Sequence, residues 1–92
     1  MSIDLYIGPL IERSGSFGYD TFSTADGRRS SFRYRRVEEA RHDRRAMIAE
    51  SRRAPHTRVH VCETLAEFER LLSSATERNG DADPGGTRSR EP

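Results

Sequence analysis

Hydrophobic and more polar residues alternate at the start of the chain with the period of two that β-strands with one buried face display. Ile3, Leu5 and Ile7 are separated by Asp and Tyr, which predicts a short half-buried strand that stops at Gly8-Pro9. Leu10-Ile11 allows a second segment at the edge of the same sheet.

A hairpin is predicted around Asp26-Gly27. Residues 17–24 are rich in aromatic and β-branched side chains, and residues 31–36 alternate aromatic with basic residues. Glycine accepts the positive φ that tight turns require, so the two segments are expected to pair through this turn.

The pattern changes to helical spacing in the second half. Residues 37–53 predict a helix that Pro55 ends, because proline disfavours helical geometry in the residue before it. Residues 58–62 predict a short strand. Thr64 and Glu67 have the spacing of a capping box, in which each side chain binds a free backbone N–H of the first helical turn. The apolar stripe of this second helix consists of Leu65, Phe68, Leu72 and Ala75.

These elements predict an α+β fold in a single domain over residues 1–78. The order β-β-β-α-β-α favours a three- to four-stranded, mainly antiparallel sheet with two helices packed on one face. The helix over residues 37–53 would serve as a crossover between two strands. Residues 79–92 offer little to bury, so we expect a flexible tail there, acidic and rich in Gly and Pro.

Composition excludes several classes of protein. No apolar run approaches the ~20 residues of a membrane span, so no membrane association is expected. Cys62 is the single cysteine, which excludes a disulfide scaffold. The first residues lack the basic segment and long apolar run of a secretory signal, and we therefore expect a cytoplasmic protein.

The net charge of +1 conceals an uneven distribution. All 16 cationic side chains are arginine, and 11 of them lie in residues 28–58 against four acids, which makes that segment +7. The flanking segments, residues 1–27 and 59–92, are each −3. Such a partition creates a local field that attracts an anionic partner.

The helix over residues 37–53 separates its charges by face. At about 100° per residue, three arginines line one flank and three acids the other, with Arg44 inside the apolar stripe. We interpret Arg44 as a structural residue, with a contact role as the alternative. The flanks could be neutralised within the monomer or could meet a partner. They comprise Arg41, Arg45 and Arg52 on one side, and Glu39, Asp43 and Glu50 on the other.

Arginines of the predicted hairpin add to this set. If Phe32 and Tyr34 pack beneath a helix, Arg33 and Arg35 stand on the other sheet face. Guanidinium groups bind phosphate or carboxylate in a bidentate manner, so the anion itself is not specified. The predicted partner-binding residues are Arg28, Arg29, Arg33, Arg35, Arg41, Arg45 and Arg52.

Residue patterns for catalysis, metals or cofactors are weak. His60 and Cys62 share a strand face, but a cysteine on a short strand is usually buried and inert. His56 and His60 are four residues apart, but no Cys-x-x-Cys pair is present to complete a zinc site with them. No P-loop is present either, so we expect no metal, no cofactor and no small-molecule substrate. A small ribonuclease toxin is the one enzymatic alternative, and its candidate residues are Tyr34, Arg35, Arg41 and His60.

The leading hypothesis is a non-catalytic protein whose Arg-rich middle binds nucleic acid, a nucleoprotein or an anionic protein surface. A phage or mobile-element accessory protein that inhibits a bacterial defence complex is one role of this kind. The alternative is a protein–protein adaptor or homo-oligomer, for example a homodimer, that uses the helix over residues 37–53.

Overall fold

Five strands and two helices form a small α+β fold in the computed structural model, which describes residues 2–82 and side chains as far as residue 75. In chain order the elements are β1 (Ile3–Ile7), β2 (Ile11–Arg13), β3 (Ser16–Ser23), β4 (Arg28–Tyr34), α1 (Val37–Arg53), β5 (Thr57–Val61) and α2 (Leu65–Ala82).

The sheet is organised around β3. On one side β3 pairs with β4 along almost its whole length. On its other side it pairs with β2 near its start and with β1 near its end, all antiparallel. β5 joins the free side of β1 in parallel, so β4 and β5 run in the same direction at opposite edges. The helix α1 is therefore the predicted crossover, and the sheet is mixed but mainly antiparallel.

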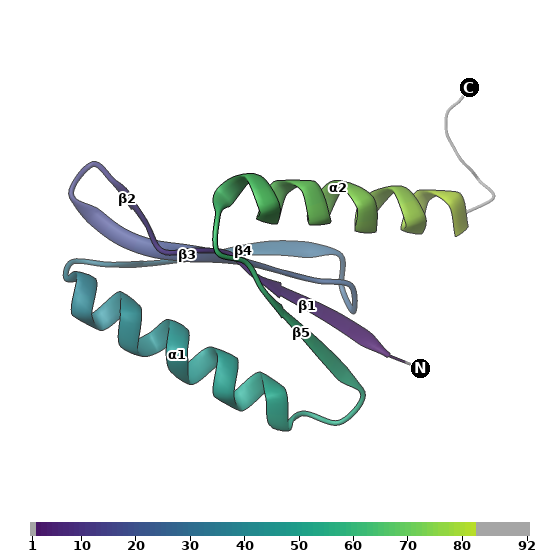
Figure 1. Ribbon diagram of the computed structural model, residues 1–92, viewed down its shortest axis with the longest axis horizontal. Coiled ribbons are helices and arrows are strands. Elements are labelled where there is room, and N and C mark those ends of the chain that lie inside the picture. Colours follow the sequence, from purple (N-terminus) through teal and green to yellow (C-terminus); the bar gives the residue numbers. More distant parts are fainter. Residues whose placement is uncertain (1, 83–92) are drawn as a thin grey trace.

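The two helices lie on opposite faces of the sheet (Figure 1), which corrects the prediction that both pack on one face. Tyr6 and Ile7 are consecutive on β1 and both are buried, so β1 is covered on both sides. Tyr6 contributes to a core cluster with Phe68 of α2. The alternation in β1 was misleading because tyrosine resembles a solvent-facing residue, whereas this ring packs near Phe22 and stacks on His60 at 4.6 Å.

Each face of the sheet has its own core. We call the face under α1 the α1 face and the opposite one the α2 face. On the α1 face the ring of Tyr19 is fully buried and stacks on Phe32 at 5.3 Å. The cluster on the α2 face consists of Tyr6, Phe22, Cys62, Phe68, Leu72 and Ala75.

Local sequence signals set the turns and helix ends. The helix α1 has the predicted bounds. Gly27 has φ +64° in the predicted turn. The backbone N–H of Glu67 donates to Thr64 Oγ1 (3.1 Å), as in a capping box, but the Glu67 carboxylate accepts from the N–H of Glu63 instead of Thr64. The box therefore starts one residue earlier than its standard form.

The strand count exceeds the prediction by one. β2 is a separate strand joined to β3 by a tight turn in which Ser14 and Gly15 both have positive φ. This turn gives the order β-β-β-β-α-β-α. At the other end, α2 extends through Ala82, and the rest of the expected tail, residues 83–92, lies outside the described residues.

Candidate nucleic-acid interface

The seven arginines predicted as one contact surface are divided between separate parts of the molecule. Because Phe32 stacks on Tyr19 on the α1 face, alternation along β4 places Arg29 and Arg33 on the α2 face. Arg28 is exposed at the start of β4, and Arg35 is exposed just after its end. The other three, Arg41, Arg45 and Arg52, are exposed on α1, which covers the opposite face.

Only part of the α2 face is covered by α2. The helix packs over β1, while β2 and the adjoining ends of β3 and β4 extend beyond it (Figure 1). We call this uncovered region the open half. Register places Arg13 of β2 across from Ser16, and Arg33 of β4 across from Gly18, on this same face. Both arginines are exposed.

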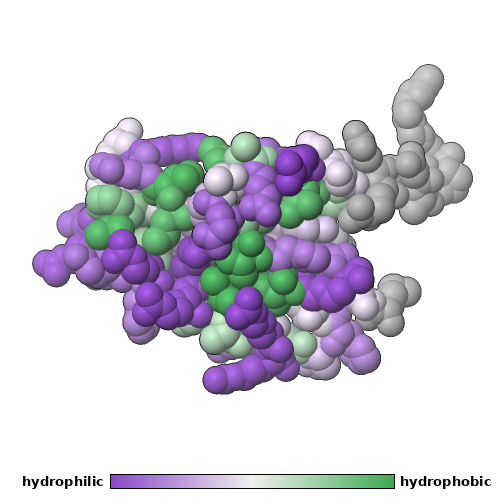
Figure 2. Space-filling view, in the orientation of Figure 1, coloured by the Kyte–Doolittle hydropathy of each residue, from purple (hydrophilic) through white to green (hydrophobic). Residues whose placement is uncertain are grey.

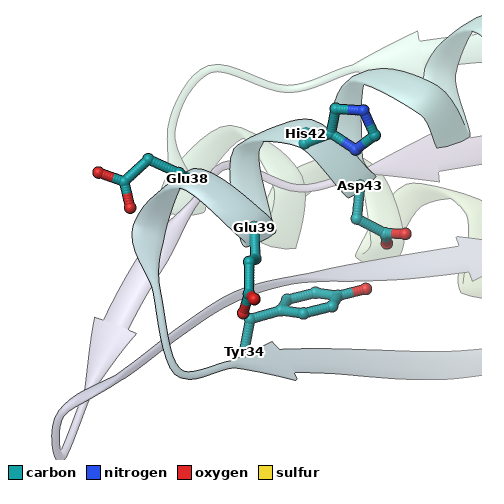
Figure 3. A pocket seen from close by; sticks show the side chains of 5 residues that line it. All are labelled: Tyr34, Glu38, Glu39, His42 and Asp43. Carbon is teal, nitrogen blue, oxygen red and sulfur yellow. The ribbon is translucent and has the colours of Figure 1, made fainter.

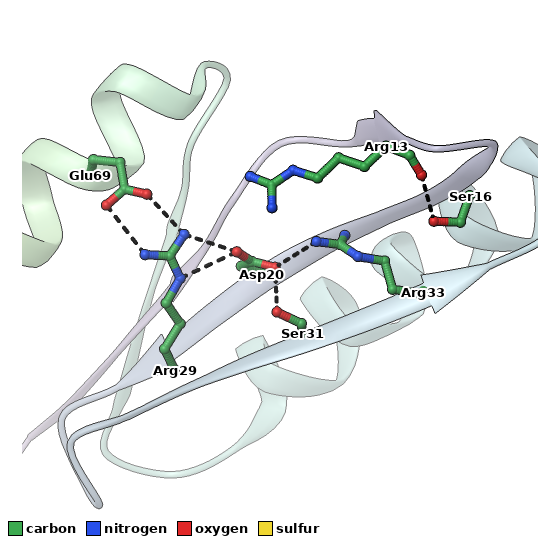
Figure 4. Close-up of polar contacts among 7 residues, drawn as sticks. All are labelled: Arg13, Ser16, Asp20, Arg29, Ser31, Arg33 and Glu69. Carbon is green, nitrogen blue, oxygen red and sulfur yellow. Dashed lines mark hydrogen bonds and ion pairs between the residues drawn. The ribbon is translucent and has the colours of Figure 1, made fainter.

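A buried carboxylate anchors two of the hairpin arginines (Figure 4). The side chain of Asp20 is only 7 % exposed. It accepts hydrogen bonds from Arg29 Nε and Nη2 (3.2 and 2.9 Å) and from Ser31 Oγ (2.8 Å). Arg33 Nη2 lies 3.6 Å from Asp20 Oδ1, the oxygen that also accepts from Ser31. Burial alone would raise the pKa of Asp20, but the donors from Ser31 and Arg29 outweigh it and the pKa is lowered.

Arg29 also links the sheet to α2. Its guanidinium donates to both oxygens of Glu69 (3.3 and 2.8 Å) and lies 5.2 Å above the ring of Phe68. With carboxylates on two sides and an aromatic ring beneath, Arg29 is a structural residue. Its charge is paired within the chain, and its predicted role in partner binding stays a prediction.

Gly18 allows Arg33 to lie flat across the sheet. A Cβ at position 18 would lie 1.9 Å from the carbonyl oxygen of Phe32 and 2.6 Å from Arg33 Nη1. The absence of a side chain therefore leaves the space that the Arg33 guanidinium occupies on its way to Asp20. Its side chain remains 31 % exposed, so donors are still available to a ligand.

Arg13 is a member of the open half that sequence reasoning missed. Figure 4 shows its side chain extending over the same face as Asp20 and Arg33. Among the residues that the structure describes, no carboxylate lies within ion-pair distance of Arg13 or Arg35. In the sequence, Arg13 stands two residues after Ile11, which places both on the same face of a strand. Only the β2–β3 register shows that this face is the α2 face. The open half thus presents more guanidinium groups than carboxylates.

The α1 face carries the opposite charge beside β4. The hydroxyl of Tyr19 donates to Asp43 Oδ2 (2.6 Å), and Tyr34 faces the same carboxylate from β4 (Figure 3). The hydrogen bond to Asp43 is the main cause that raises the pKa of Tyr34, to about 12. A shallow depression here is lined by Tyr34, Glu38, Glu39, His42 and Asp43. These acids make this region unfavourable for a polyanion.

The arginines of α1 lie on the side away from Asp43. The interpretation of Arg44 as a structural residue is confirmed by two hydrogen bonds. Its Nε donates to the carbonyl oxygen of Gly8 (2.8 Å) and its Nη2 to that of Cys62 (3.2 Å). Gly8 and Cys62 directly follow β1 and β5, so Arg44 points toward these two strands. The arginine flank, on the other side of Arg44 from Asp43 around the helix, therefore faces the β5 edge of the sheet. No carboxylate of the described residues pairs with the guanidinium groups there, which belong to Arg41, Arg45 and Arg52.

The residues considered for catalysis do not come together. Cys62 is buried, as expected, and burial raises the pKa of its thiol. The ring of His60 binds Asp4 Oδ1 (3.0 Å) and not the thiol. Tyr34 and His60, from the ribonuclease set, belong to strands at opposite edges, about 14 Å apart across three strand spacings.

In residues 2–82, no group of three His, Cys, Asp or Glu side chains is arranged to hold a metal ion. No helix in that range is long and apolar enough to cross a membrane. Comparisons with protein-family models, curated proteins and solved structures find no match to this chain.

Proposed function

We propose that this chain is a cytoplasmic, non-catalytic protein that binds nucleic acid through the open half of its α2 face. The observation that carries the proposal is the pair of exposed arginines on one uncovered sheet surface, Arg13 and Arg33. Arg35 is exposed just beyond the end of β4 and adds a third positive charge near them. Sheet surfaces of this kind are known to enter DNA grooves, with arginines that contact phosphates or guanine edges.

The Asp20 network favours binding by holding Arg33 in one orientation. A guanidinium that is already fixed loses less side-chain entropy when it binds phosphate than a freely rotating one. Arg33 Nη2 lies 3.6 Å from Asp20 Oδ1, an ion-pair distance that is too long for a hydrogen bond, so the N–H groups of Arg33 can still donate to a ligand. Arg13 and Arg35 would supply the uncompensated charge for the phosphate backbone.

The proposal is tested by fluorescence anisotropy with a labelled duplex of about 20 base pairs and a single-stranded RNA of similar length, across a salt series. We expect affinity to fall steeply with salt, because bound phosphates release counterions. Arg13→Ala and Arg35→Ala should each weaken binding about 3- to 10-fold and reduce the salt slope by about 1.

Arg53→Ala is the matched control. Arg53 is exposed in the last turn of α1, on the other side of the sheet, and its loss should leave binding unchanged. If neither nucleic acid binds at about 50 mM salt, or if Arg53→Ala weakens binding as much as Arg13→Ala does, the open half is not the interface.

A further inference from the structure

The edge strand β5 and the neighbouring flank of α1 form a surface that the proposed function does not use. β5 pairs only with β1 among the described strands. Ile3 N–H donates to the His56 carbonyl, and Cys62 N–H donates to the Ile7 carbonyl. In a parallel ladder these bonds mean that the even-numbered residues of β5 direct their backbone N–H and C=O groups toward β1. The N–H and C=O groups of Thr57, Val59 and Val61 therefore point away from the sheet.

An apolar strip borders this edge. Val59 and Val61 are half-buried, as is Ile48 of α1, which lies on the helix side that faces β5. Figure 2 shows a hydrophobic patch between α1 and β5, with hydrophilic side chains around it. An exposed strand edge beside apolar side chains is the arrangement that accepts an added strand.

The charge beside the two sheet edges differs. Along α1, the acids that include Glu39 and Asp43 lie toward β4, whereas Arg41, Arg45 and Arg52 lie toward β5. A strand added at β5 would project alternate side chains onto the α1 face, beneath this row of arginines. Acidic side chains at those alternate positions would be complementary to it.

We infer that β5 is a docking strand for an extended acidic segment of another protein. The segment adds as a sixth strand, with main-chain hydrogen bonds to Thr57, Val59 and Val61 and with carboxylates against the arginines of α1. This interaction is independent of nucleic-acid binding, because it uses the opposite face and the opposite edge of the sheet.

A second copy of this chain fits the edge less well. Two β5 strands paired across a two-fold axis would bring both Arg flanks of α1 together, which is repulsive. Pairing of β5 with β4 of another copy would bring the acidic flank of the second α1 toward the Arg flank, but such a head-to-tail contact leaves one β5 edge uncovered unless the copies close into a ring.

The test uses a capped peptide of about seven residues in which glutamate alternates with valine or threonine, added to the full ¹⁵N-labelled chain. We expect amide hydrogen exchange at Thr57, Val59 and Val61 to slow by about tenfold or more, since these N–H groups gain partners. The amides of Arg58 and His60 already bind β1 and should change little. A peptide with lysine in place of glutamate is the control for charge and should not slow exchange.

Variants separate docking from general attraction. Arg41→Glu combined with Arg45→Glu should weaken peptide binding by about tenfold or more, whereas Arg53→Glu on the outer side of the same helix should have little effect. The inference is overturned if the three outward amides keep their exchange rates, or if both variants weaken binding equally. Light scattering that shows a dimer blocked by the peptide would assign the edge to a second copy instead. A loss of duplex binding in the Arg41/Arg45 variant would assign the flank to nucleic acid.

Discussion

The two faces of the sheet differ in how their helices cover them. On the α1 face, a helix of 17 residues contacts β3, β4 and β5 and is fastened to β3 by the bond from Tyr19 to Asp43. On the α2 face, an apolar helix stripe that includes Phe68 covers β1 and leaves the open half exposed. One strand can therefore contribute an aromatic ring to an apolar core and, two residues away on the same face, a buried carboxylate that holds arginines at the edge of the uncovered region, as β3 does with Phe22 and Asp20.

The largest effect should come from emptying the covered part of the α2 face. Phe68→Ala removes a fully buried ring, and we expect the free energy of unfolding to fall by about 3–5 kcal/mol. Urea denaturation followed by circular dichroism measures it. Leu65→Ala, at a half-buried position on the same helix, should cost clearly less. Equal losses would show that α2 does not pack as tightly as described.

On the α1 face, Tyr19→Phe keeps the ring and removes the hydroxyl that binds Asp43. We expect a loss of about 1.5–3 kcal/mol at neutral pH, the usual range for a hydrogen bond to a charged group. The hydrogen bonds from Tyr19 and then Tyr34 lower the pKa of Asp43 below 3.8. Because the pKa of Asp43 is lower in the folded than in the unfolded chain, its ionisation stabilises the fold at pH values above the unfolded-state pKa. That stabilisation is lost as the pH falls through the folded-state pKa.

The pH dependence checks the same contact. Unfolding followed from about pH 5 down to pH 2 should show a smaller acid loss in Tyr19→Phe than in the parent chain, because the variant has less carboxylate stabilisation to lose. If both proteins lose the same amount of stability between pH 5 and pH 2, the hydroxyl does not stabilise the ionised form of Asp43.

In the open half, Gly18→Ala should shift the backbone between β3 and β4 and displace Arg33. We expect a cost of about 1–3 kcal/mol from overpacking. Gly15→Ala is the comparison: its Cβ meets no atom within 4 Å, and only the φ of +81° opposes it, so about 1 kcal/mol is expected. If Gly18 tolerates alanine better than Gly15 does, β3 and β4 are not in close contact there.

The smallest effect on stability is expected on the arginine flank of α1. Arg41→Glu with Arg45→Glu changes two exposed side chains, and the free energy of unfolding should move by less than about 0.5 kcal/mol. Thermal unfolding measures it. A marked drop in the melting temperature would show that these arginines stabilise the monomer and are not a contact surface.

Much of the local structure was predictable because its causes are local. Pro55 follows the end of α1, Asp26-Gly27 forms the hairpin turn, and Thr64 caps α2. Each of these signals acts within a few residues, so the sequence contains both the cause and its effect.

The layer arrangement and the state of the arginines depend on distant residues. Arg29 reaches Glu69, forty residues later, and no spacing rule connects them. Tyr6 could be assigned to a core only once α2 was known to cover its face. The density of arginine in the sequence therefore supports the hypothesis of an anion-binding protein but does not show which guanidinium groups are paired within the chain. The register of β2 on β3 was needed to add Arg13 to the candidate site.

The parallel pairing of β1 with β5 affects the order in which the molecule can form. The turns between β2, β3 and β4 join residues close in sequence, so these strands can associate early and rapidly. Ile3 instead meets Thr57, and this loop closes only after α1 has been made. During synthesis the first strand therefore emerges long before its parallel neighbour, and completion of the sheet is expected to be the slow step of folding.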